Sequence, residues 1–77
     1  MKERFTKLPA YFYEDGRIWF HDLWMNLFQV EGFIETDIEY TSPEGDEVTT
    51  NGTKVFCKSG MEYDIYMPLE EFLELMS

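Results

Sequence analysis

The residues that could carry covalent chemistry in this sequence are few. A single histidine, His21, and a single cysteine, Cys57, occur among 77 residues. Nucleophilic catalysis needs a thiol or hydroxyl with a base within hydrogen-bonding reach. Cys57 alternates with Val55 and Thr53, as a small buried strand residue does, and His21 is interpreted as a surface residue at a strand end. Because no serine stands in a Gly-x-Ser-x-Gly turn either, the sequence predicts no catalytic residue and a protein that is not an enzyme.

Metal and cofactor motifs are equally scarce. A structural zinc site takes four cysteine or histidine ligands, and the chain has two such residues. The acids around Glu44-Gly45-Asp46-Glu47 lack the spacing of a calcium-binding loop. The sequence contains no glycine-rich phosphate loop and no dinucleotide-binding motif. We therefore expect no metal ion and no cofactor.

Carboxylates are the chemical groups that stand out. The chain has 16 Asp and Glu against 6 Lys and Arg, a net charge of −10, so repulsion excludes ordinary binding to nucleic-acid phosphates or anionic lipids. Glu35, Asp37 and Glu39 alternate with apolar or neutral residues, which places them on one strand face about 6.5–7 Å apart. Such a row is similar in charge and pitch to nucleic-acid phosphates and would attract basic clefts. The alternative is a solvated strand face that keeps a sheet edge from aggregating.

Further acids and two aromatic anchors extend this candidate surface. Glu31 prolongs the row if Gly32 allows a β-bulge. The aromatic fraction of 18% exceeds what a small interior takes up, and tryptophans ringed by acids are typical anchors of protein interfaces. The candidate partner-binding residues are Glu31, Glu35, Asp37, Glu39, Glu62, Asp64, Trp19 and Trp24.

The strongest local signal is a hairpin over residues 11–20. Two apolar runs flank Asp15-Gly16, a pair suited to the positive φ angles of a type I′ turn. In that register Glu14 faces Arg17 and Phe12 faces Trp19. Both faces of this ribbon are apolar, so one face packs on the core and the other needs a helix or a second chain to cover it.

The rest of the chain predicts further strands and a closing helix. Residues 22–28 are ambiguous, and we favour one or two helical turns from Leu23 to about Leu27, capped by Asp22. Alternation then predicts strands over residues 34–40, 47–50, 53–57 and 61–67, with a turn at 42–46, a type I′ turn at Asn51-Gly52 and a loop at 58–60. Pro68 begins a helix whose apolar stripe is Leu69, Phe72, Leu73 and Met76.

These elements define one small α+β domain over residues 1–77, a mostly antiparallel meander of five or six short strands with a C-terminal helix. Residues 1–8 form a short basic arm that is expected to fray. One cysteine cannot form an intrachain disulfide, and no apolar run approaches the ~20 residues of a membrane span. We therefore expect a cytoplasmic protein with no signal peptide, in the host cytoplasm if it is phage-encoded.

Two resemblances accompany this interpretation. Residues 53–63, running into Pro68-Leu69-Glu70-Glu71-Phe72-Leu73-Glu74-Leu75, resemble the strand–turn–strand–helix unit of small bacterial and phage proteins such as those similar to the flagellar protein FlbD. That resemblance implies a fold and no residue roles. In size, acidity and lack of catalytic groups, the chain is similar to phage-encoded inhibitors of host defence, the DNA-mimic anti-CRISPR and anti-restriction proteins.

The leading functional hypothesis is a non-enzymatic inhibitor that occupies the basic cleft of a nucleic-acid-binding protein. Charge would set the association rate and its salt dependence, and a tryptophan would anchor the complex. One alternative is a structural or regulatory subunit that forms a homodimer through the aromatic face of the hairpin. Another is an immunity or antitoxin partner of a basic nuclease. Such a protein would also bind through its acidic residues and would differ only in its target.

Overall fold

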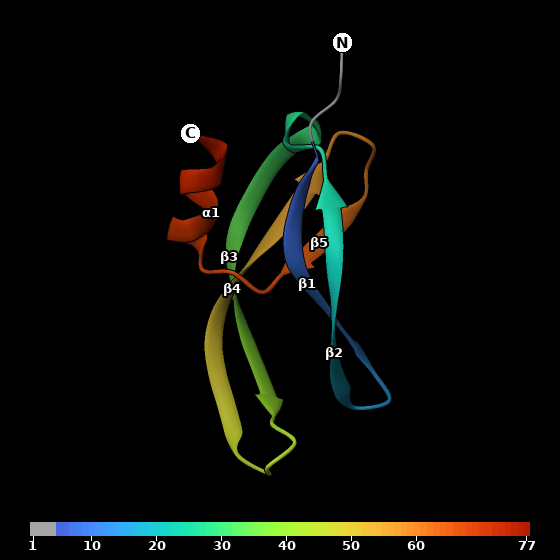
Figure 1. Ribbon diagram of the computed structural model, residues 1–77, viewed down its shortest axis with the longest axis vertical. Coiled ribbons are helices and arrows are strands. Elements are labelled where there is room, and N and C mark those ends of the chain that lie inside the picture. Colours follow the sequence, from blue (N-terminus) through green and yellow to red (C-terminus); the bar gives the residue numbers. More distant parts are fainter. Residues whose placement is uncertain (1–4) are drawn as a thin grey trace.

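A computed structural model describes residues 5–77 as a five-stranded antiparallel sheet with one C-terminal helix (Figure 1). The strands follow the order β2-β1-β5-β4-β3, so β2 and β3 are the two edges. The elements are β1 (Thr6–Glu14), β2 (Arg17–Met25), the 3₁₀ turn η1 (Leu27–Gln29), β3 (Val30–Thr41), β4 (Glu47–Cys57), β5 (Glu62–Ile65) and α1 (Leu69–Met76). The α+β class and the mostly antiparallel sheet are as predicted, with five strands. The predicted meander is wrong, because β1 pairs with β5 and the chain passes from β2 at one edge to β3 at the other edge.

The β1–β2 hairpin has the predicted register. Glu14 pairs with Arg17 and Phe12 with Trp19. Asp15 and Gly16 have φ angles of 54° and 74°, which the type I′ turn requires at both central positions.

The predicted helix at residues 22–28 is wrong for most of its length. β2 continues to Met25 because its side chain and that of Leu23 pack into the core, opposite Thr6 and Leu8 of β1. A single 3₁₀ turn follows, and its cap is Asn26, whose Oδ1 accepts a hydrogen bond from the Phe28 N–H at 3.0 Å. Asp22, the predicted cap, lies inside the strand. Burial of Leu23 and Met25 in the core therefore outweighs the helical spacing of the apolar residues in this segment.

The predicted turn at Asn51-Gly52 is also wrong. β4 passes straight through these residues, with Asn51 opposite Asp37 and Gly52 opposite Thr36. A Cβ atom on Gly52 would collide with the Ile38 side chain and lie 2.9 Å from the carbonyl oxygen of Ile65. Glycine is needed here because two neighbours approach the backbone closely. The predicted strands 47–50 and 53–57 are therefore one strand.

Replacing Gly52 by alanine is expected to destabilise the protein by about 1–3 kcal/mol, because the added methyl group overpacks a closed site. Gly32→Ala is the matched control, since a Cβ there meets nothing within 4 Å. Thermal unfolding followed by circular dichroism measures both. Equal melting temperatures for the two variants would contradict this role of Gly52.

The remaining predicted elements are close to their expected positions. The turn at 42–46 is closed by a hydrogen bond from the Ser42 N–H to the Asp46 carbonyl at 2.7 Å. In the loop at 58–60, the Gly60 N–H donates to the Cys57 carbonyl at 2.9 Å. β5 is shorter than the predicted 61–67. The strand–turn–strand–helix order over residues 53–76 is present.

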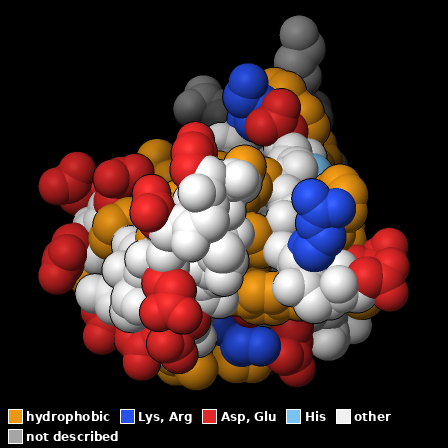
Figure 2. All heavy atoms as spheres, turned by 90° about the horizontal axis from the view of Figure 1, so that it is seen from below, with side chains coloured by type: hydrophobic (Ala, Val, Ile, Leu, Met, Phe, Trp, Pro, Cys, Tyr) orange, Lys and Arg blue, Asp and Glu red, His pale blue; other side chains and the backbone are white. Residues whose placement is uncertain are grey.

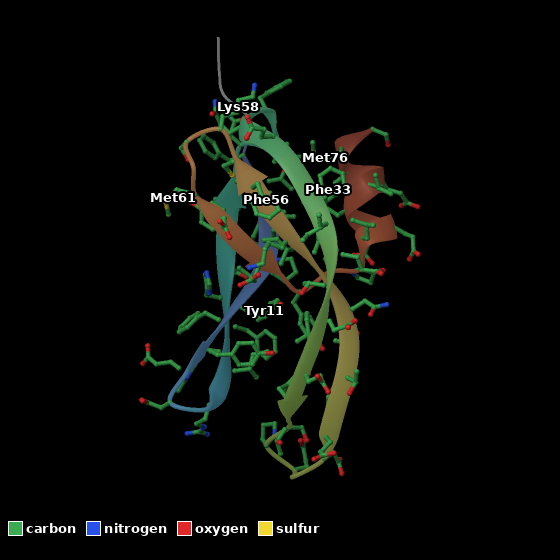
Figure 3. The ribbon with its side chains drawn as sticks, turned by 180° about the vertical axis from the view of Figure 1, so that it is seen from behind. Tyr11, Phe33, Phe56, Lys58, Met61 and Met76 are labelled. Atoms are coloured by element: carbon green, nitrogen blue, oxygen red, sulfur yellow. The ribbon has the colours of Figure 1, made fainter. Side chains whose placement is uncertain are left out.

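The main core lies between the sheet and α1. Side chains opposite each other in paired strands share a face, and the register puts Leu8, Val55 and Ile65 on the face that α1 covers, here called the helix face. Phe72 of α1 is fully buried and its ring meets that of Phe33 edge-on, with centroids 4.9 Å apart. Phe33 and Met76 can be followed beside the helix in Figure 3. Leu73, predicted to belong to the buried stripe, is 47% exposed.

A second cluster lies on the other face, here called the tyrosine face. β5 has four residues, so the β1–β2 and β3–β4 hairpins extend beyond it as two arms of a molecule 47 Å long (Figure 1). Aromatic rings join the arms: Phe20 meets Tyr66 and Tyr40 at 5.0 and 5.9 Å between centroids. The tyrosine cluster comprises Tyr11, Tyr13, Phe20, Tyr40 and Tyr66.

The N-terminal segment is more ordered than predicted over its second half. Thr6, Lys7 and Leu8 belong to β1, and Leu8 is fully buried. The predicted arm over residues 1–4 lies outside the described residues. None of the helices between residues 5 and 77 has the length and apolar character needed to cross a membrane.

Candidate functional site: an acidic arm

The acidic row of Glu35, Asp37 and Glu39 lies on the β3–β4 arm. The three residues are exposed on the helix face of edge strand β3, beyond Phe33. Their cross-strand partners on β4 are the neutral residues Thr53, Asn51 and Thr49. Within residues 5–77 no ion pair involves the row. The row therefore presents uncompensated negative charge to solvent.

The tip of the same arm adds to this charge. Glu44, Asp46 and Glu47 are exposed in and beside the turn. No lysine or arginine occurs from residue 18 to residue 53. In Figure 2 acidic side chains gather on the left, the side on which Figure 1 places α1 and the β3–β4 arm. The acidic arm, defined as the row plus these three tip residues, carries six carboxylates and no lysine or arginine.

The structure places Glu31 outside the row. A bulge between Val30 and Gly32 is present as the sequence suggested. However, Phe33 takes the next helix-face position before Glu35, and its ring packs on Phe72. An apolar residue thus separates Glu31 from the row.

Glu62 and Asp64 lie on the opposite face from the acidic row. They face Phe56 and Lys54 across β4 and β5. Lys54 Nζ lies 3.9 Å from Glu62 Oε1 and 3.5 Å from Asp64 Oδ1. Their charge is therefore partly compensated within the chain.

The two tryptophans lie on opposite faces of edge strand β2. Trp19 is 45% exposed on the helix face and Trp24 is 61% exposed on the tyrosine face. Each already holds a cation of its own chain, Arg17 at 5.6 Å from the Trp19 ring and Lys7 at 5.9 Å from the Trp24 ring. Among residues 5–77, no hydrogen bond joins either tryptophan to the side chains of the row on β3.

Cys57 and His21 are not brought together. β2 and β4 are separated by β1 and β5, a spacing of about 14 Å between their backbones. Burial raises the pKa of the Cys57 thiol, which disfavours the reactive thiolate. Across the described residues, no group of three or more His, Cys, Asp or Glu side chains is placed to hold a metal ion.

Sequence reasoning missed the tyrosine cluster. The hydroxyls of Tyr40 and Tyr66 share a hydrogen bond of 3.0 Å, and the Tyr13 hydroxyl donates to the Glu39 carbonyl at 3.0 Å, linking the arms. Burial, the charge of Asp64 and the nearby Tyr13 together raise the pKa of Tyr11 to about 12. The sequence did indicate that the second face of both hairpins is apolar, which could have predicted this cluster. Tyrosine suits such a half-buried face because its ring can be buried while its hydroxyl stays hydrated.

The raised pKa of Tyr11 predicts a loss of stability at alkaline pH. The unfolded phenol ionises near pH 10, whereas the folded one keeps its proton until about pH 12. The contribution of Tyr11 to the free energy of unfolding is therefore fully present below pH 10 and is lost as the pH rises towards 12. Tyr11→Phe should flatten this fall in chemical denaturation measured between pH 9 and 12. The same fall in both proteins would contradict the prediction.

In comparisons with known proteins, no family model, no curated protein and no solved structure matches the chain.

Proposed function

We propose that this protein is a non-enzymatic inhibitor whose acidic arm occupies the basic, nucleic-acid-binding cleft of a partner protein. The observation that carries the proposal is the uncompensated row of Glu35, Asp37 and Glu39 on a two-stranded arm that projects from the core. A strand holds these carboxylates at nearly regular spacing. Basic clefts that bind phosphates attract such an array.

Electrostatics explains why an exposed row suits this role. Exposed charges remain hydrated in the free protein, so the fold bears little desolvation cost for keeping them. Complementary charge speeds association and suppresses partners of the wrong sign. The proposal places the contact on the acidic arm and leaves out Glu31, Glu62 and Asp64, which the fold separates from it.

The test is competition with nucleic acid. Immobilised protein is exposed at 50 mM salt to an extract of the cells in which it acts, and retained proteins are identified by mass spectrometry. We expect a basic nucleic-acid-binding protein that is released by rising salt and by added duplex DNA or RNA, because the binding sites overlap. A retained partner that binds its nucleic acid and this protein simultaneously would refute the proposal. If the retained partner is a nuclease, the protein is an immunity or antitoxin protein of that nuclease.

A second candidate function is homodimerisation through the β1–β2 hairpin. Phe12 and Trp19 are 42% and 45% exposed on its helix face, beside the free edge of β2. An exposed aromatic patch next to an unpaired edge favours association with another sheet. Light scattering on the wild type and on Trp19→Lys decides it, since a dimer would dissociate in the variant and a monomer would be unchanged.

A further inference from the structure

A groove opens between the tips of the two arms on the tyrosine face. It has a volume of about 660 Å³, within the range of small-molecule sites. Its lining includes Tyr13, Ile18, Phe20, Tyr40, Ser42 and Pro43. Tyr13 and Phe20 are each 52% exposed, so their rings are accessible from the groove.

The exposed rings of the groove lack a cation from the described part of the chain. Trp19 and Trp24 are each covered by a basic side chain of this chain, whereas within residues 5–77 no cation lies over Tyr13 or Phe20. Arg17 contributes to the lining, but its guanidinium lies over Trp19, which the register puts on the helix face. The groove therefore presents bare aromatic surface, which cations bind favourably.

The surroundings of the groove are acidic and rich in acceptors. Glu14 and Asp15 stand at one tip and Glu44, Asp46 and Glu47 at the other. The Glu39 carbonyl on the free edge of β3 accepts a hydrogen bond from the Tyr13 hydroxyl at 3.0 Å, and both residues line the groove. A guanidinium has five N–H donors and a flat face for stacking on a ring.

We propose that this groove binds an arginine side chain of the partner, stacked on Phe20 and Tyr13 and donating a hydrogen bond to the second lone pair of the Glu39 carbonyl. The inference rests on the proposed function and deepens it. The acidic row attracts the basic surface from a distance, and the groove holds one arginine in a defined place. Arginine fits better than lysine because its planar fork stacks and donates at once.

The first experiment locates the site with a defined probe. A capped hexa-arginine peptide is added to the ¹⁵N-labelled full chain at 50 mM salt, and backbone amide shifts are recorded by NMR. We expect the largest shifts over residues 16–20 and 39–43. The hexa-citrulline peptide, which has the same shape without charge, should cause none. Shifts confined to Glu35, Asp37 and the outer face of β4 would overturn the groove and leave the acidic-arm proposal standing.

The second experiment removes the aromatic face without changing charge. Phe20→Leu should weaken hexa-arginine binding about tenfold, since one stacked cation is lost. Trp24→Leu removes an aromatic that is 61% exposed, against 52% for Phe20, and lies outside the groove. This variant should bind within twofold of wild type. Thermal unfolding verifies that both variants fold. Equal affinities for the two variants, or no binding of hexa-arginine to the wild type, would overturn the inference. The proposed function is tested separately, by the competition with nucleic acid.

Discussion

Neutralising the acidic row with Glu35→Gln, Asp37→Asn and Glu39→Gln is expected to weaken partner binding about 10- to 100-fold at 50 mM salt. Each exposed charge contributes roughly 0.5–1 kcal/mol to such a contact, and every 1.4 kcal/mol is tenfold in affinity. The three residues are exposed and make no ion pair with another described residue. Their loss should therefore leave the fold intact. Affinity for the captured partner is measured by titration calorimetry at two salt concentrations.

The matched control separates position from net charge. Asp22→Asn, Glu62→Gln and Asp64→Asn remove the same three charges from the tyrosine face. We expect this variant to bind within about threefold of wild type, because attraction between exposed charges is screened over about 14 Å at 50 mM salt. A steeper salt dependence for the control than for the row variant would also assign the ionic contacts to the row, because only the control retains the row. Equal losses in the two variants would mean that net charge alone drives binding.

Replacing Phe72 by alanine is expected to lower the stability of folding by about 3–5 kcal/mol, the usual cost of a large buried cavity. Phe72 is fully buried and is the only buried residue of α1. A chain of 77 residues typically has a total stability of about 4–12 kcal/mol. The melting temperature should therefore fall by roughly 12–40 °C, as measured by circular dichroism.

Leu73→Ala provides the comparison within the same helix. Leu73 is 47% exposed, and alanine is the best helix former, so we expect a change below about 1 kcal/mol. A drop as large as that of Phe72→Ala would show that Leu73 is buried in solution, for example by a second copy of the chain. Concentration dependence of the melting temperature distinguishes that case.

The sequence by itself determined the parts of the fold that depend on neighbouring residues. Asp15-Gly16 placed the first turn and its register, because positive φ angles are available to few residues. Alternation over residues 34–40 placed the acidic row on one strand face, since the side-chain period of a strand is two. Pro68 and the stripe led by Phe72 marked the C-terminal helix.

Only the tertiary structure decided what depends on distant neighbours. Leu23 is in a strand and Gly52 is not in a turn because β1, Ile38 and Ile65 surround them, and no local pattern reports such contacts. The same holds for the surface: Glu62 and Asp64 share the alternation of the acidic row, yet strand pairing turns them to the other face and beside Lys54. The groove between the arms exists because β5 ends after four residues while the two hairpins continue. Periodicity tells which residues share a face, whereas pairing across the sheet decides which faces meet.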